Sequence, residues 1–192
     1  FNSVLTENQN GAKIAVEHLI GHGHERIQFL GLSDKLYTLT ARYQGYRKAM
    51  LEAGLVPGKH LTCSTEEETR TLIQKALSRR RGPTAFFMGN NLVMRHALHS
   101  FSRLNVKIPD EIAVASFDDF EMADIFNPAI TVVRQPSFEL GRVAAELLFA
   151  RLAKTKASFA GQQIVLPVEL VIRESCGCNP RKTPKIRSLK EE

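Results

Sequence analysis

Three groups of polar side chains follow apolar segments that are typical of buried strands. Asn90 and Asn91 follow "FFMG", Asp118 and Asp119 follow "IAVASF", and Arg42 lies in the polar stretch after "FLG". In an open parallel sheet the carboxyl ends of the strands face one crevice, where ligands bind. An amide, a carboxylate and a guanidinium can exchange hydrogen bonds with the adjacent hydroxyls of a sugar or another polyol. The pattern therefore predicts a small polar ligand at this edge of the sheet.

Each of these residues also has a plainer interpretation. Asn90 or Asn91 could cap the helix that follows. Arg42 could be a surface residue on the next helix, and Asp118 could cap a turn. Taken singly, the plainer interpretation is favoured for each residue, and only their convergence on one edge favours a ligand.

The sequence contains no recognisable catalytic constellation. Neighbouring residues on a strand point to opposite faces, so Asp118 and Asp119 cannot flank one bond as a glycosidase pair does. The patterns G-x-S-x-G, G-x-x-x-x-G-K-[ST] and H-E-x-x-H do not occur. We therefore expect a binding protein rather than an enzyme, and no cofactor.

Two weaker patterns could hold a metal. His18 and His22 are four residues apart, which can place two ligands on one helix face, and His24 lies close by. Cys176 and Cys178 are separated by one glycine. A polar helix end and an incomplete ligand set are the simpler interpretations, so we expect no metal. Three cysteines without framework spacing indicate a reducing, cytoplasmic compartment.

The hydrophobic pattern predicts a parallel α/β fold. Apolar residues recur at helical spacing in several segments that alternate with short apolar runs. The predicted order is β-α-β-α-β-α-β-α-β, a long loop, and then β-α-β, which is typical of a parallel sheet with helices on both faces. The last run, "QQIVLPVELVIR", reads as one long strand whose Pro167 suits an edge position.

Composition is that of a globular protein with a sizeable core. The chain has 192 residues, 43% hydrophobic and 24% charged, and no apolar run approaches the ~20 residues that a membrane helix needs. The net charge is +6, and the ending "RKTPKIRSLKEE" contributes five basic and two acidic residues. We expect residues 179–192 to be a solvated basic tail rather than a nucleic-acid site. The start at Phe1, in what reads as the middle of a strand, suggests a piece of a longer protein.

Several stretches resemble the effector-binding region of the lactose-repressor (LacI) family of transcription regulators, which is similar to the periplasmic sugar-binding proteins. They are "NGAKIAVEHLIGHGHERIQFLG", "ARYQGYRKAMLEAGL", "PTAFFMGNN", "VKIPDEIAVASFDD", "PAITVVRQPSFELGRVAAELL" and "LPVELVIRESCG". They stand in family order and cover nearly all of the chain from Val4 to Gly177.

The resemblance implies a periplasmic-binding-protein-like type I fold, with ligand held between two lobes and the N-terminal lobe incomplete. On this basis residues 25–129 form the C-terminal lobe, with a returning strand at 162–175. Residues 1–24 and 130–161 are expected to be the remnant of the N-terminal lobe. The hinge crossings are expected near residues 23–27, 120–130 and 159–164.

The same resemblance assigns ligand contacts by position. Arg42 matches the arginine of an R-x-x-G pattern completed by Gly45, Asn90 ends the "PTA" strand, and Asp118 is the first aspartate after "ASF". Gln135 matches a position that contacts sugar in some relatives. This chain departs from the family at Asn91, where aspartate is usual, at His96, where a small glycine is usual, and after "HLTCS", where some relatives place an aromatic wall.

The resemblance implies a function as the ligand-sensing and dimerising region of a bacterial regulator. The expected partners are a sugar or nucleoside-like effector, a second copy of the chain, and DNA only through a helix-turn-helix domain outside this sequence. An input module of a kinase or nucleotide cyclase and a periplasmic transport protein are the alternatives. No membrane contact is expected.

Overall fold

The computed structural model describes residues 1–152 and 161–177, so the predicted tail at 179–192 lies outside the described residues. The elements are β1 (Ser3–Thr6), α1 (Asn8–Gly21), β2 (Ile27–Gly31), α2 (Tyr37–Glu52), β3 (Leu61–Thr62), α3 (Glu66–Leu77), β4 (Ala85–Met88), α4 (Asn91–Arg103), β5 (Ala113–Phe117), β6 (Thr131–Arg134), α5 (Ser137–Leu152), β7 (Gln163–Leu166) and β8 (Glu169–Val171). No helix within the described ranges combines the length and apolar character needed to span a membrane.

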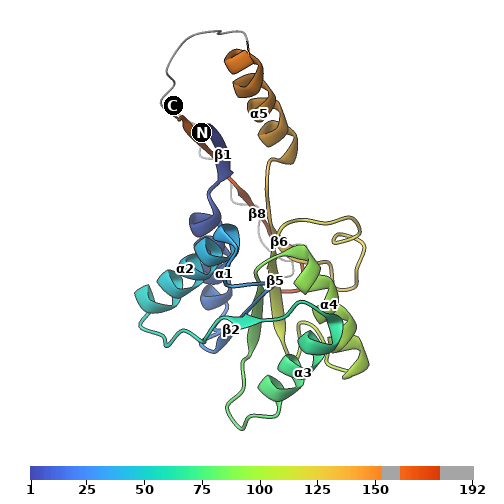
Figure 1. The fold of residues 1–192 in the computed structure, drawn as a ribbon. Coiled ribbons are helices and arrows are strands. Elements are labelled where there is room, and N and C mark those ends of the chain that lie inside the picture. Colours follow the sequence, from blue (N-terminus) through green and yellow to red (C-terminus); the bar gives the residue numbers. More distant parts are fainter. Residues whose placement is uncertain (153–160, 178–192) are drawn as a thin grey trace, which may run out of the picture.

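The body of the molecule is a six-stranded sheet with the order β3-β2-β4-β5-β6-β8. All neighbours pair in parallel except β8, which runs antiparallel to β6 at one edge. Helices α1 and α2 cover one face of the sheet, and α3 and α4 cover the other (Figure 1). The predicted parallel α/β architecture is confirmed.

The central strands are buried from end to end because both of their faces are covered. Successive side chains on a strand point to opposite faces, so Phe86 packs into the core under α3 and α4, whereas Phe87 packs into the core under α1 and α2. This explains why "TAFFMG" is continuously apolar rather than alternating.

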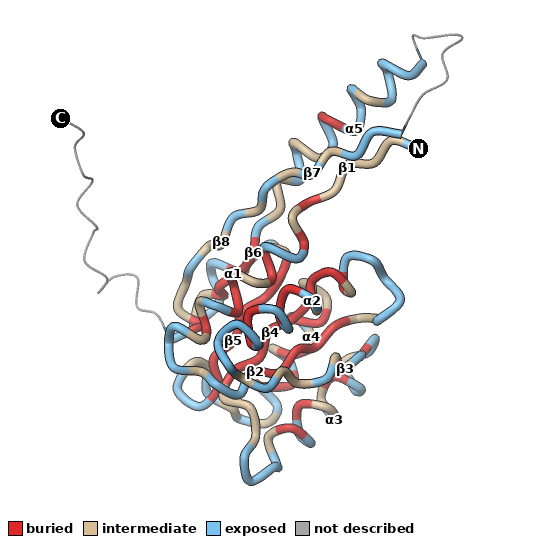
Figure 2. Tube along the Cα trace, turned by 90° about the vertical axis from the view of Figure 1, so that its left-hand side faces the viewer, coloured by how far each residue is buried: buried red, intermediate tan, exposed pale blue. Residues whose placement is uncertain are grey.

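A smaller unit projects from this body. Strand β1 pairs in parallel with β7 in a separate two-stranded sheet, and α5 packs beside β1. We call this unit the arm. Figures 1 and 2 show that it extends away from the six-stranded sheet and is largely exposed or half-buried. The run predicted as one strand is divided at Pro167, which has no N–H to donate to a ladder: β7 belongs to the arm, and β8 to the main sheet.

The packing corrects the expected lobe boundaries. Helix α1 does not accompany β1 into the arm, because its buried stripe, which includes Ala12, Val16 and Leu19, packs on α2 and the six-stranded sheet. Strand β6 is likewise an inner strand of the main sheet. The chain therefore crosses between the two sheets at residues 6–8, 134–137 and 166–169, rather than at the three positions predicted from the resemblance.

Candidate functional site

The three crossings lie together at the base of the arm. Thr6 Oγ1, at the end of β1, donates a hydrogen bond of 2.8 Å to Gln135 Oε1, which directly follows β6. The backbone N–H of Glu7 donates to the carbonyl of Leu166, the last residue of β7, at 3.0 Å. Side chains placed here therefore touch the connection between arm and body.

Arg42 is the buried centre of this region. It projects from α2, and its side chain is 5% exposed. Nε donates to Asn8 Oδ1 at 2.8 Å, and Nη1 donates both to the carbonyl of Gly89 at 2.8 Å and to Asp118 Oδ2 at 3.0 Å. The guanidinium carbon also lies 3.8 Å from the centre of the Phe117 ring, in cation–π range.

The buried guanidinium is balanced by its partner. Burial lowers the pKa of Arg42 below its ordinary value, while the charge and hydrogen bond of Asp118 act to raise it. An arginine remains protonated in either case. The cation is thus held in a low-dielectric site by one carboxylate and two neutral oxygens, and removing that carboxylate would leave a poorly compensated charge.

Asp118 joins Arg42 to the crossings. It follows β5 directly and has a φ of 70°, a left-handed conformation that aspartate tolerates better than most residues. Oδ2 accepts from Arg42 and Oδ1 accepts from Gln135 Nε2 at 2.5 Å. A continuous chain of hydrogen bonds therefore runs Asn8–Arg42–Asp118–Gln135–Thr6. We call these five side chains the hinge network.

Asn90 stands outside this network. Its Oδ1 accepts from the backbone N–H of Val93 at 3.4 Å and caps α4, as the plainer interpretation suggested. Only its neighbour Gly89 is bound by Arg42, through the backbone carbonyl. The structure thus brings together three of the four predicted site residues, Arg42, Asp118 and Gln135, and gives Asn90 a capping bond.

Two members of the network were not anticipated. Asn8 is 4% exposed and its Nδ2 donates to the carbonyl of Thr6, so both residues are fixed at the first crossing. The only available signal was the polar sequence "TEN" between a strand and a helix. That signal is weak, because Asn and Thr are common wherever helices begin.

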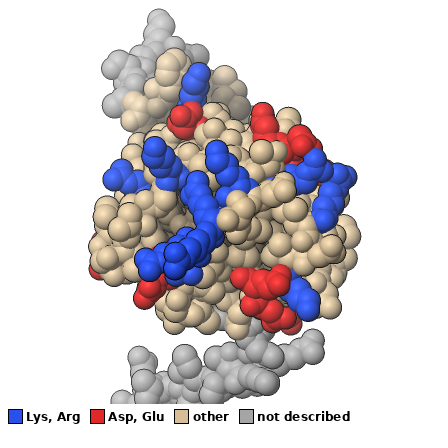
Figure 3. Space-filling model, turned by 90° about the horizontal axis from the view of Figure 1, so that it is seen from below, with Lys and Arg blue, Asp and Glu red and all other residues tan. Residues whose placement is uncertain are grey.

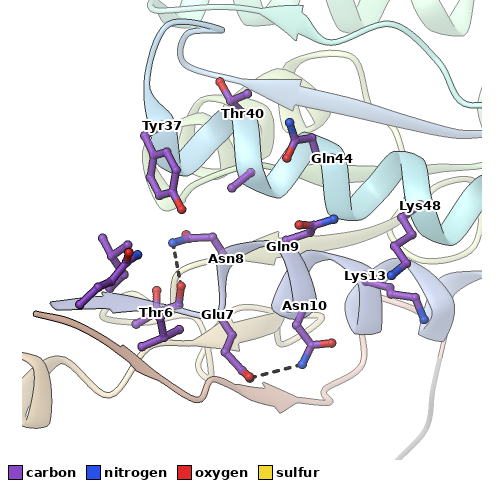
Figure 4. A pocket seen from close by; sticks show the side chains of 14 residues that line it. Thr6, Glu7, Asn8, Gln9, Asn10, Lys13, Tyr37, Thr40, Gln44 and Lys48 are labelled. Carbon is purple, nitrogen blue, oxygen red and sulfur yellow. Dashed lines mark hydrogen bonds between the residues drawn. The ribbon is translucent and has the colours of Figure 1, made fainter. Parts of the chain in front are cut away.

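A cavity of about 500 Å³ adjoins the hinge network between the arm and helices α1 and α2 (Figure 4). Its size is within the range of small-molecule sites. Most of its lining is polar: Thr6, Glu7, Asn8, Gln9, Asn10, Lys13, Tyr37, Thr40, Gln44, Lys48 and Gln163, with Leu5, Ala41 and Val165 as the apolar members. Because Thr6 and Asn8 belong to both the lining and the network, a ligand in this cavity would touch the hinge directly.

Asp119 is engaged separately from Asp118. It accepts from Arg134 at 2.7 and 2.9 Å and from Arg173 at 3.1 and 3.2 Å. Burial alone would raise the pKa of this carboxyl, but the hydrogen bonds and charges of the two arginines outweigh it and hold the pKa below its ordinary value of 3.8. The adjacent carboxylates therefore have different partners, and Asp119 ties the end of β5 to β6 and the segment after β8.

The histidine and cysteine patterns meet in space. His18 Nε2 lies 3.2 Å from Cys176 Sγ, and the rings of His18 and His22 have centroids 4.5 Å apart. Within residues 1–152 and 161–177, however, no three His, Cys, Asp or Glu side chains are arranged to hold a metal ion. Cys178 lies outside the described residues.

Known proteins match this chain over most of its length. Residues 16–176 match the family described as "periplasmic binding protein-like domain". The HTH-type transcriptional repressor PurR of Photobacterium profundum is 31% identical over 170 residues, which are 87% of this chain and 50% of that protein. The repressor MelR of Bacillus subtilis is 26% identical over 192 residues, 95% of this chain and 55% of that protein. The chain thus spans about half the length of the curated relatives that it matches.

Solved structures agree with this match. A complex of the transcriptional regulator CelR with cellobiose has a TM-score of 0.81 and 28% identity, covering 91% of this chain and 54% of that one. A regulatory protein of the LacI family from Chloroflexus aggregans has a TM-score of 0.81 and 31% identity, covering 91% of this chain and 63% of that one. This chain therefore covers only part of each of these two solved chains.

Proposed function

The chain belongs to the periplasmic binding protein-like family, among the LacI-type regulators, and from that premise we propose that it senses a sugar or a similar small polar effector held between two lobes. The observation that carries the proposal is the hinge network. Side chains suited to binding hydroxyls are buried beside a polar cavity and bonded directly to two of the three crossings between arm and body.

The network provides a physical route from binding to shape. A polyol that takes hydrogen bonds from Gln135 or Thr6, or gives them to Asp118, competes with the bonds that now hold the crossings. Such a ligand favours whichever arrangement of arm and body satisfies all groups at once. Only this difference in affinity between arrangements moves the equilibrium. In the whole regulator, a change in lobe orientation would alter the spacing of DNA-reading domains.

We assign the effector contacts to Arg42, Asn90, Asp118 and Gln135. For Asn90, the capping bond uses only Oδ1 and leaves the amide donors available to a ligand oxygen. The complex of the transcriptional regulator CelR with cellobiose shows that a protein of similar structure takes a sugar. For this chain the same class of ligand is part of the proposal, and so are a DNA-contacting domain elsewhere in the protein and a cytoplasmic location.

We also propose that a second copy of the chain pairs through α4 and the loop after β5. There, a cavity of about 680 Å³ is lined partly by apolar side chains, including Leu98, Phe120, Met122 and Phe126. Met122 is 57% exposed and neighbouring Ile125 68%. Exposed apolar groups of this kind, rimmed by polar residues, are typical of interaction surfaces. Sedimentation of an Ile125→Asp variant should show loss of the dimer, whereas Leu51→Asp, at an exposed position on α2 outside this surface, should leave the dimer intact.

Calorimetry and thermal shift on the full protein test the effector assignment. A panel of ribose, cellobiose, other sugars and nucleosides should contain a ligand that raises the melting temperature. At a free ligand concentration of 100 times Kd, that ligand adds about 2.7 kcal/mol to the free energy of unfolding. Asp118→Asn should weaken its binding by about tenfold or more, as for a lost hydrogen bond to a charged group. Asp124→Asn, at an exposed position, is the control. Equal affinity in the two variants would reject the site.

The alternative outputs are distinguishable in the gene. A helix-turn-helix domain in the same reading frame supports a repressor, whereas a kinase or nucleotide cyclase domain supports a sensor. PurR and MelR are transcriptional repressors, which favours the first output and disfavours an enzyme or a transport protein.

A further inference from the structure

An arginine-lined hollow lies at the opposite ends of the strands from the hinge network. It has a volume of about 560 Å³ and is formed by three loops, those entering β2, following α2 and following α3. Its lining includes Arg26, Arg79, Arg80 and Arg81, with Glu25 as the one acidic member. We call it the arginine hollow. Figure 3, viewed from below, faces this end of the molecule and shows Lys and Arg side chains gathered across it.

The positive charge of the arginine hollow is not neutralised within the described chain. The ion pairs found in residues 1–152 and 161–177 involve none of its four arginines, and all four are exposed. A cation at the end of α3 complements the helix dipole, but Lys75 already occupies the last turn. The dipole also cannot explain Arg26, which comes from another loop. Four guanidinium groups around one hollow favour an anionic occupant.

The loop that presents these arginines is fixed by its backbone. Arg79 N donates to the carbonyl of Ala76, and Gly82 N donates to the carbonyl of Arg79. A Cβ at Gly82 would lie 2.7 Å from the carbonyl oxygen of Ala76, so the turn approaches the helix as closely as only glycine allows. Arg26 Nε donates to the carbonyl of Gly82 at 2.8 Å and links the two arginine-bearing loops. A loop held this way loses little freedom when a ligand binds.

The hollow combines this charge with an apolar wall. Leu55 is half-buried and Val56 is 88% exposed, and both line the same space. Planar guanidinium forks match phosphate oxygens bidentately, and a valine left in solvent gives a ring or sugar face something to pack on. We propose that the arginine hollow is a second ligand site, which takes a small phosphate ester such as a sugar phosphate or a nucleoside monophosphate.

This site does not depend on the proposed effector site. It lies at the amino ends of the strands, whereas Asp118 follows the carboxyl end of β5. Its ligand chemistry also differs, since the hinge network combines a carboxylate, amides and one arginine that is already paired. Either site can therefore fail its test without affecting the other.

Titration calorimetry on the full protein, at low and moderate salt, tests the proposal. The probes are inorganic phosphate, AMP and glucose 6-phosphate, with adenosine and glucose as uncharged counterparts. The double variant Arg80→Gln/Arg81→Gln should weaken binding of the esters by about tenfold or more for each bidentate guanidinium–phosphate pair that it removes. Lys107→Gln/Arg151→Gln removes the same charge from exposed positions outside the hollow and should bind as the unchanged protein does. Unchanged melting temperatures confirm that both variants fold.

Three results would overturn the assignment. The first is no heat of binding from either ester up to millimolar concentration. The second is equal weakening in both double variants, which would mean that only overall charge matters. The third is that a short DNA duplex binds more tightly than either ester and that Arg80→Gln/Arg81→Gln weakens duplex binding as much as ester binding. That result would make the surface a contact for polyanions rather than a small-molecule site.

Discussion

Replacing Asp118 tests whether the hinge network stabilises the fold, in addition to its proposed role in ligand binding. The Asp118 side chain is 19% exposed and that of its partner Arg42 is 5% exposed. Removing one partner of a buried ion pair costs about 3–5 kcal/mol because the other charge stays buried. Arg42 keeps its bonds to Asn8 and to the carbonyl of Gly89, which places this case below that range. For Asp118→Asn we expect a loss of about 2–3 kcal/mol in the free energy of unfolding.

The backbone separates two parts of the effect. Asp118 has a φ of 70°, which alanine adopts at a cost of about 1–2 kcal/mol, whereas asparagine and glycine adopt it readily. Asp118→Ala should therefore be about 1 kcal/mol less stable than Asp118→Asn. Asp118→Gly should recover part of that difference although it removes the whole side chain.

Urea denaturation and thermal melting, both monitored by circular dichroism, measure these differences. For a protein of this size each kcal/mol corresponds to about 2–4 °C, so Asp118→Asn should melt about 4–12 °C below the unchanged protein. Asp124→Asn is the matched control, because Asp124 is exposed and makes no ion pair among the described residues. A double-mutant cycle with Arg42→Met isolates the pair. If the two single losses simply add, or if Asp118→Asn is as stable as the control, the buried pair does not contribute as argued.

Other consequences of the packing can be measured in the same melting experiment. A Cβ at Gly45 would lie 2.1 Å from the carbonyl oxygen of Gln9, so Gly45→Ala should lower the free energy of unfolding by about 1–3 kcal/mol. A Cβ at Gly141 would have no atom of the other described elements within 4 Å, so Gly141→Ala should raise the free energy of unfolding by up to about 1 kcal/mol through the better helix propensity of alanine in α5. The pKa of Asp119 is lower in the folded protein than in the unfolded chain. Its contribution to the free energy of unfolding is therefore fully present above the unfolded pKa and is lost as the pH falls through the folded pKa. Between pH 5 and pH 2, the difference in free energy of unfolding between the unchanged protein and Asp119→Asn should therefore become smaller. Thr65→Ala should cost about 1 kcal/mol by removing the cap of α3, and an unchanged melting temperature would contradict the capping box.

Much of the fold could be predicted because it depends on local patterns. Continuous apolar runs mark strands covered on both faces, and apolar residues at helical spacing mark α1, α2, α4 and α5. The acidic first turn of α3 is part of its cap, because Thr65 accepts from the backbone N–H of Glu68, whose carboxylate bonds back to Thr65. The lobe boundaries were not predictable in this way. The stripe of α1 shows that one face is buried but carries no information on which sheet buries it.

The candidate site could also be predicted only in part. The sequence predicts Arg42 and Asp118 as one site because the carboxyl ends of parallel strands meet at one edge of the sheet. Gln135 is predicted from the family resemblance. In the structure, Asp118 accepts hydrogen bonds from both Arg42 and Gln135. Their pairing with Asn8 and Thr6 was not predictable, because it depends on where the chain crosses between the two sheets. The crossings are set by tertiary packing, which places residues more than a hundred positions apart in contact.

The pairing of Arg42 with Asp118 also constrains how the proposed effector can act. Because each group already satisfies the other, a ligand hydroxyl gains only the difference between the new hydrogen bonds and those it replaces. Affinity must then come mainly from the polar cavity beside the network, and the exchange at Asp118 serves chiefly to convert binding into a change at the crossings. A variant that removes the pair should therefore weaken coupling between ligand and lobe orientation more than it weakens binding through the cavity. Two variants separate binding from coupling. Gln44→Ala, at the cavity wall, should lower ligand affinity and leave the ligand-induced change in the X-ray scattering profile intact. Asp118→Asn should diminish that change in the scattering profile even at saturating ligand.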